Sequence, residues 1–209
     1  MKKTLSLLAA VALTLAATTA QASSIPIGDY HGGGTLSNFG NATGFWFTPT
    51  ANILVTDLGV YDNDALGLAS AHDIGIFTTG GAAVVTTSIA AGLSGTFVPG
   101  SVNGTRFIAV APTALTAGLD YYIIASNFGT DRFAFGTGAV TFAPEITWRG
   151  FADATANNIF SAVNLFGGQP GNLGPNFEFA APVPEPATLV LLGSGLVAAR
   201  ARRWLRRRR

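Results

Sequence analysis

Apolar residues in the central part of the chain recur at alternate positions, and no stretch there sustains a helical period. Alternation of this kind is typical of half-buried strands. Glycine is also abundant, with 24 among residues 23–182, a fraction about twice the usual one. Short strands joined by glycine-bearing turns predict an all-β body, an antiparallel β-sandwich or jelly roll. We expect its strands at residues 44–48, 53–61, 73–77, 83–89, 106–110, 121–125, 132–135 and 176–180.

The core of this body is expected on the face of each strand that carries its large apolar side chains. In the sequence Phe45-Trp46-Phe47, neighbouring rings must point to opposite faces, so Trp46 is expected to face away from the core. The glycine-rich run 166–175 is expected to be an irregular loop. The expected core residues are Phe45, Phe47, Leu54, Leu58, Ile74, Ile76, Phe107, Ile123, Phe133 and Phe135.

The N-terminal 22 residues have the three parts of a secretory signal peptide. Lys2 and Lys3 are followed by an apolar run from Leu5 to Ala17, and Ala20 and Ala22 supply the small residues of a cleavage site. This order predicts a signal helix that is removed by cleavage after Ala22. An uncleaved N-terminal anchor is the alternative.

The C-terminal 28 residues combine a proline-rich motif, a short apolar helix and a basic end. Pro184 and Pro186 favour an extended stretch, and the 13 residues of 187–199 carry no charge. As a helix this run would rise about 20 Å, short of a bilayer core of about 30 Å. The seven arginines after it predict a short transmembrane helix whose basic end stays in the cytoplasm. A buried core helix followed by a nucleic-acid-binding arm is the alternative.

The motif Val183-Pro184-Glu185-Pro186, the apolar run and the arginine-rich end together resemble the PEP-CTERM sorting signal of Gram-negative bacteria. The resemblance implies an exosortase as partner and a membrane-anchored intermediate, followed by delivery to the cell surface or release. It also implies an association with exopolysaccharide and biofilm. We therefore expect a signal peptide at 1–22, a body at 23–181 and a sorting tail at 182–209.

The body differs in charge from the whole chain, whose formal net charge is +1. Residues 23–182 contain three arginines, ten acidic residues and no lysine, which gives a formal net charge of −7. A body this acidic repels nucleic acid and anionic membranes. The chain also has no cysteine, which excludes disulfides and thiol nucleophiles.

The body resembles an uncharacterised β-sandwich domain that is common in PEP-CTERM proteins. The resemblance lies in segments 44–48, 55–62, 72–77 and 115–122, whose residues are mostly structural. It implies a fold and brings no activity with it.

Two groups of side chains are candidates for binding. Asp57, Asp62, Asp64 and Asp73 have the oxygen ligands that Ca²⁺ prefers, although their spacing fits no EF-hand loop and turn formation is the alternative role. Six aromatic side chains are a possible sugar-stacking platform, namely Trp46, Trp148, Tyr30, Tyr61, Tyr121 and Tyr122. Its preferred members are Trp148, the adjacent Arg149 and Trp46. Core or edge packing is the alternative for these rings.

No arrangement of residues marks a catalytic centre. His31 begins a glycine run like that of some esterases, but the chain has no Gly-x-Ser-x-Gly elbow to complete such a site. The carboxylates show no spacing typical of a glycosidase pair. We therefore expect a non-enzymatic surface or matrix protein without a cofactor, and a carbohydrate-binding module with structural calcium is the alternative.

Overall fold

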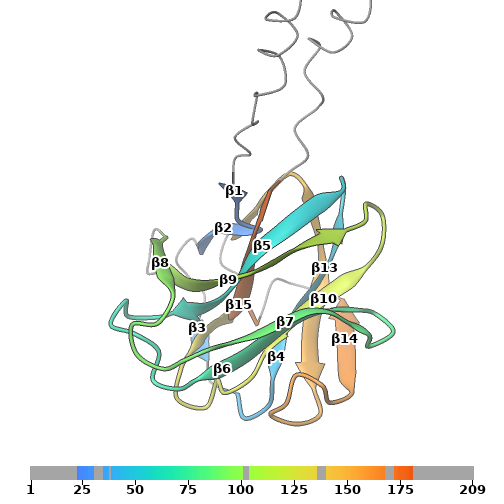
Figure 1. Ribbon diagram of the computed structural model, residues 1–209. Coiled ribbons are helices and arrows are strands. Elements are labelled where there is room, and N and C mark those ends of the chain that lie inside the picture. The colour runs from blue at the N-terminus through green and yellow to red at the C-terminus, as the bar shows by residue number, and fades with distance from the viewer. Residues whose placement is uncertain are drawn as a thin grey trace, which may run out of the picture. The chain divides into compact units, whose positions relative to one another are not determined.

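Two antiparallel sheets pack face to face in the body (Figure 1). This computed structural model describes residues 23–30, 35–37, 39–100, 104–135, 140–167 and 172–180. The expected signal peptide with Ala20 and Ala22 lies outside the described residues. So does the expected sorting tail, with Val183, Pro184, Glu185, Pro186 and the apolar run 187–199.

The first sheet has five strands in the order β1-β15-β5-β9-β8. Its long members are β5 (Ile53–Asp62) and β9 (Gly104–Leu115), and β15 (Pro175–Ala180) pairs with β5. The edges are β1 (Ser23–Ser24) and β8 (Thr96–Pro99).

The second sheet has six strands in the order β14-β13-β4-β10-β6-β7. These are β4 (Thr43–Pro49), β6 (His72–Thr78), β7 (Ala83–Ile89), β10 (Tyr121–Ala125), β13 (Ile146–Ala154) and β14 (Val163–Gly167). Two short ladders lie outside both sheets. One joins β2 (Ile27–Tyr30) to β12 (Val140–Phe142), and the other joins β3 (Thr35–Ser37) to β11 (Phe133–Phe135).

Strands were predicted best where alternation is regular. Each of the eight expected strands overlaps an observed strand, and no helix occurs in the part of the chain that the structure describes. β13, which contains Trp148, is not among the expected strands, and Phe166 and Gly167 belong to β14 rather than to the expected loop. The expected all-β antiparallel architecture is thus confirmed for the body.

The core lies between the two sheets and is rich in phenylalanine. Phe47 from β4 meets Phe177 from β15 with ring centroids 5.1 Å apart, so this pair joins the sheets directly. Phe45 and Phe179 extend the same buried layer. Burying each such side chain contributes about 1.5–3 kcal/mol relative to leaving it exposed, which makes this layer a main source of stability.

Two of the ten expected core residues are wrong. Leu54 is only half-buried, because Thr56 is an extra residue in β5 that has no direct partner on β15. Such a bulge reverses the facing of the strand, so Ile53 and Val55 point inward before it and Leu58 points inward after it. Phe135 is 46% exposed, since it ends the short strand β11 outside the two main sheets.

The two ends of the body are neighbours in the first sheet. Ser23 of β1 pairs with Ala180 of β15, and Ser24 pairs with Phe179. The chain therefore enters and leaves the body at adjacent points of one sheet edge.

Candidate functional site

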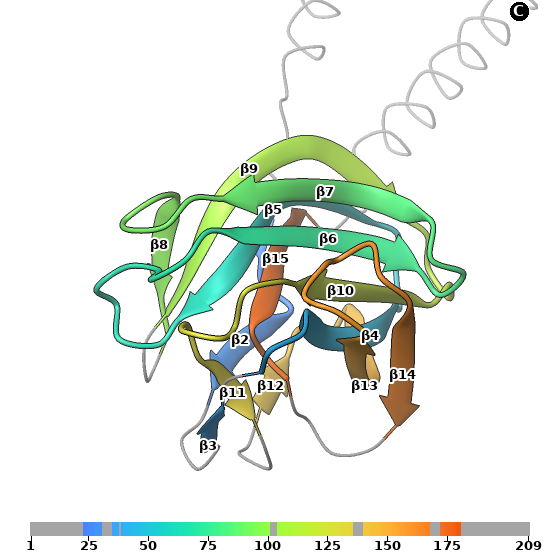
Figure 2. The ribbon, with the colours of Figure 1, turned by 90° about the horizontal axis from the view of Figure 1, so that it is seen from below.

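The outward face of the six-stranded sheet carries a second apolar layer of its own. The connection between β13 and β14 reaches over this face toward β10 and β6 (Figure 2). Its residue Ile159 is buried there against the sheet. We call the layer the outer cluster, and its buried members are Ala42, Phe77, Tyr122, Ile124, Ala152, Ala154 and Ile159.

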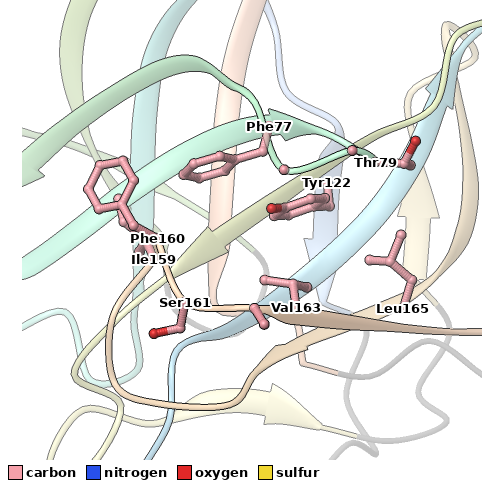
Figure 3. A pocket seen from close by; sticks show the side chains of 11 residues that line it. Phe77, Thr79, Tyr122, Ile159, Phe160, Ser161, Val163 and Leu165 are labelled. Atoms are coloured by element: carbon pink, nitrogen blue, oxygen red, sulfur yellow. The ribbon is translucent and has the colours of Figure 1, made fainter.

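A groove of about 280 Å³ opens on the outer cluster (Figure 3). One wall is the turn Thr79–Gly81 between β6 and β7, and the other is the Ile159–Val163 connection. Phe77 and Tyr122 form the floor, with their rings stacked at 5.2 Å and an interplanar angle of 10°. Its volume is just below the range of about 300–1,000 Å³ that small-molecule sites occupy.

Phe160 forms the rim of this outer groove. Its ring stands edge-on to Phe77 at 5.8 Å and an angle of 82°, and it is 67% exposed. An exposed ring supported by buried rings offers a ligand a fixed apolar surface at little cost in side-chain entropy.

Tyr122 presents a polar atom to the same groove from a buried position. The residue is 4% exposed, and among the described residues no group makes a hydrogen bond with its hydroxyl. In Figure 3 this hydroxyl is directed toward the connection that carries Ile159 and Ser161. Burial raises the pKa of Tyr122, so the hydroxyl stays protonated and can both donate and accept a hydrogen bond.

The two tryptophans of the expected platform lie on opposite faces of one sheet. Trp46 is on the outward face, as predicted, where it packs on the outer cluster and donates its indole N–H to the carbonyl of Phe166 at 3.1 Å. It lies opposite Gly150, where any Cβ would collide with the indole and with the Phe166 carbonyl. Trp148 packs on the inward face against the core. The structure therefore does not bring these rings together.

Arg149 occupies a bulge beside Trp148. It is the extra residue between Trp148 and Gly150 when β13 pairs with β4. Its side chain is exposed, and its Nε donates to Thr48 Oγ1 at 2.7 Å. The Trp148 indole N–H is buried without a hydrogen-bond partner, a condition that costs about 1–3 kcal/mol.

The four aspartates considered for calcium are engaged separately. Asp62 accepts from Arg106 Nε at 2.7 Å and from the Gly67 amide, while Asp64 accepts from the Leu66 amide. Asp73, on the other sheet, accepts from Ser88 Oγ, and Asp57 lies midway along β5. Within the described ranges, no three His, Cys, Asp or Glu side chains converge in a way that could hold a metal ion.

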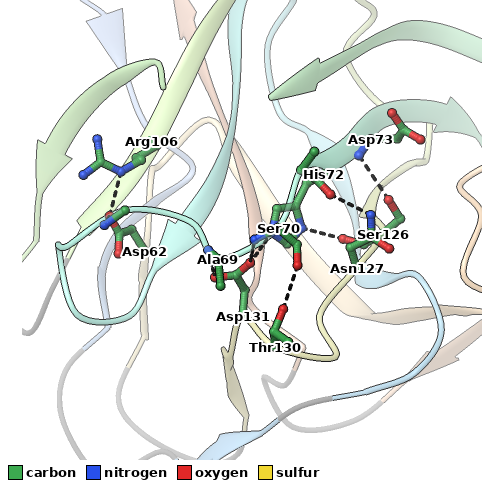
Figure 4. A network of polar contacts seen from close by, with 12 residues as sticks. Asp62, Ala69, Ser70, His72, Asp73, Arg106, Ser126, Asn127, Thr130 and Asp131 are labelled. Atoms are coloured by element: carbon green, nitrogen blue, oxygen red, sulfur yellow. Dashed lines mark hydrogen bonds and ion pairs between the residues drawn. The ribbon is translucent and has the colours of Figure 1, made fainter. Parts of the chain in front are cut away.

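A buried polar network links the loop after β5 to the loop after β10 (Figure 4). Asp131 accepts from the amides of Ala69 and Ser70 at 2.7 and 2.8 Å, and His72 Nε2 lies 2.9 Å from the same carboxylate. The other ring nitrogen of His72 bonds the backbone carbonyl of Ser126. Neither nitrogen bonds a serine hydroxyl, so this network lacks the nucleophile–base contact of a hydrolase.

Asp153 of β13 is a half-buried carboxylate with two hydrogen-bond donors. It accepts from Thr43 Oγ1 and from Asn172 Nδ2, the latter at 2.7 Å. Burial raises the pKa of Asp153, although both hydrogen bonds act in the opposite direction. At a pH between the pKa of Asp153 in the unfolded chain and its higher pKa in the folded chain, the folded chain binds more protons than the unfolded one. The free energy of unfolding therefore falls as the pH rises through that window.

We expect Asp153→Asn to raise the melting temperature at pH 7, because the substitution removes a charge whose burial is unfavourable. The amide oxygen can still accept from Thr43 and Asn172, since both bonds go to one carboxylate oxygen. The gain should shrink as the pH falls below the ordinary aspartate value, where both chains are neutral at this position. Thermal melts of the two proteins between pH 3 and pH 7 test this, and a gain that does not vary with pH would contradict it.

Comparison with known families identifies the C-terminal segment. Residues 182–209 match the family described as the PEP-CTERM protein-sorting motif. The chain therefore carries a C-terminal sorting signal of that type, as the sequence predicted, and the motif implies processing by an exosortase. No curated protein matches the chain. The part of the chain with described coordinates contains no helix long and apolar enough to cross a membrane.

Of the three rings of the outer groove, only Tyr122 belongs to the expected sugar-stacking platform. Phe77 and Phe160 were not expected to bind a ligand. The available signal for Phe160 was the pair Ile159-Phe160, two large apolar residues in a connection that otherwise contains small and polar residues.

Proposed function

We propose that the chain is an exported protein that an exosortase cuts near Pro184-Glu185-Pro186 and passes to the cell surface or the extracellular matrix. There its acidic body acts without catalysis, in association with exopolysaccharide. The observation that carries the proposal is the match of residues 182–209 to the sorting motif.

The end of the body supports this assignment. β15 ends at Ala180, two residues before the matched segment begins, and it pairs with β1, which begins directly after the expected cleavage site at Ala22. Both expected processing sites are therefore within a few residues of one pair of strands. A protein that is trimmed at both ends keeps its whole sheet under this arrangement.

The C-terminus of the protein recovered from its host tests the proposal. We expect mass spectrometry of the surface and medium fractions to find a chain that begins at Ser23 and lacks Arg209. Replacing Pro184, Glu185 and Pro186 with alanine should leave the uncut chain in the membrane fraction. Arg203→Lys, which keeps the charge of the tail, is the matched control, and an intact Arg209 on the surface protein would refute the proposal.

A further inference from the structure

We propose that the outer groove binds a neutral sugar ring of a polysaccharide, with the Phe160 ring against the apolar face of the sugar and the Tyr122 hydroxyl bonded to one of its hydroxyl groups. This binding site is separate from the sorting signal and does not depend on how the tail is processed.

The first argument is the Tyr122 hydroxyl. The side chain is 96% buried, but its hydroxyl oxygen is not, so this oxygen opens on the groove and is available to bond a ligand there. The hydroxyl gains a partner when a ligand with its own hydroxyl or ether oxygen enters. An apolar occupant such as a leucine or phenylalanine side chain would instead leave it without one.

The second argument is charge. None of the residues that line the outer groove carries a formal charge, and the body around it has a formal net charge of −7. A cationic ligand would find no carboxylate in the groove, and an anionic one would be repelled by the body. The chemistry therefore favours an uncharged ligand that is rich in hydroxyl groups.

The third argument is the exposed ring of Phe160 and the polar groups that lie beside it. Phe160 exposes most of its ring beside the floor of stacked rings, and a pyranose has an apolar face of C–H groups that can lie on such a surface. Polar groups surround it, because Thr79 and Ser161 carry hydroxyls and Gly80 and Gly81 present backbone. The groove is open at the surface, so a ring within a longer polymer can enter without a free chain end.

Binding of neutral hexasaccharides to the full-length chain tests this inference. Cellohexaose, mannohexaose, isomaltohexaose and chitohexaose are the probes, and the chain is kept in an amine-oxide detergent because sugar-based detergents would compete. We expect saturable binding of at least one probe by calorimetry. The methyl glycoside of the same sugar should bind more weakly at the same groove, which distinguishes a polymer site from a monosaccharide site.

Two substitutions assign the binding to the groove. Tyr122→Phe removes one oxygen and is expected to weaken binding about 3- to 10-fold while leaving the melting temperature unchanged or slightly higher, since the hydroxyl has no partner to lose. Phe160→Ala should weaken binding about 3- to 10-fold through loss of the ring surface. Phe39→Ala is the matched control, because Phe39 is 40% exposed and does not line the groove.

Three results would overturn the inference. They are no saturable binding of any neutral hexasaccharide, binding that both groove variants retain at full strength, and preferential binding of a phenylalanine- and leucine-rich hexapeptide that Phe160→Ala abolishes. The last result would assign the groove to an apolar peptide. All three are independent of whether Arg209 is removed in the host.

Discussion

Asp131→Ala is expected to destabilise the body by about 3–5 kcal/mol, because it removes the acceptor of three hydrogen bonds and each unsatisfied buried group costs about 1–3 kcal/mol. The carboxylate accepts three hydrogen bonds, from the amides of Ala69 and Ser70 and from His72 Nε2, and alanine would replace none of them. His72 is fully buried, with its other ring nitrogen on the Ser126 carbonyl. Removing Asp131 therefore leaves His72 Nε2 without its partner at a position that water does not reach.

The measurement is a thermal melt followed by circular dichroism. For a body of this size each kcal/mol corresponds to about 2–4 °C, so the expected fall is large and easily measured. Asp73→Ala is the matched control, since Asp73 is an exposed aspartate next to His72 whose carboxylate, within the described part of the chain, bonds only the hydroxyl of Ser88. Similar melting temperatures for Asp131→Ala and the control would show that the network does not hold the two loops together.

The contact between His72 and Asp131 could not be predicted from the sequence. His72 and Asp131 are 59 residues apart, and they meet only because β6 and β10 are neighbours in the six-stranded sheet. The alternation of apolar residues predicts single strands, and it contains no information on which strands pair. Asp131 therefore looked like an ordinary loop residue in the sequence.

Bulges account for the other differences between expectation and structure. Thr56 and Arg149 each add one residue to a strand, so the alternation changes phase within β5 and within β13. A fixed period of two assigns Leu54 to the wrong face and hides β13 altogether. Where no bulge interrupts the strand, as in Phe45-Trp46-Phe47, the predicted facing of all three rings is confirmed.

The outer groove was only partly predictable for a related reason. Phe77, Tyr122 and Phe160 come from three separate segments, and Phe160 reaches the sheet because the connection after β13 folds back over it. Composition marks aromatic residues as candidates, but the pairing of strands decides which of them share a face. The same pairing places Trp46 and Trp148 on opposite faces of the sheet, although both are tryptophans.

Phe177→Ala is expected to destabilise the body by about 3–5 kcal/mol, the usual cost of truncating a buried phenylalanine. Phe177 is fully buried and lies 5.1 Å from Phe47 of the opposite sheet and 5.9 Å from Phe179, so its loss opens a cavity between the sheets. Thermal melts should show a fall comparable to that of Asp131→Ala. Phe39→Ala, the same change at an exposed ring, is the control and should melt close to the unaltered protein.

The position of Phe177 in the chain gives this variant a second, independent readout. β15 is the last described strand, and it lies between β1 and β5 in the five-stranded sheet. The core therefore lacks Phe177 and Phe179 until residues up to Ala180 are available, and the sorting motif begins at residue 182. We expect a chain truncated after Leu173 to show no cooperative melting transition, and Phe177→Ala to be degraded faster than Phe39→Ala in the exporting host. A truncated chain that still melts cooperatively would show that the two sheets close without β15, and the coupling between folding and the arrival of the sorting signal would then not hold.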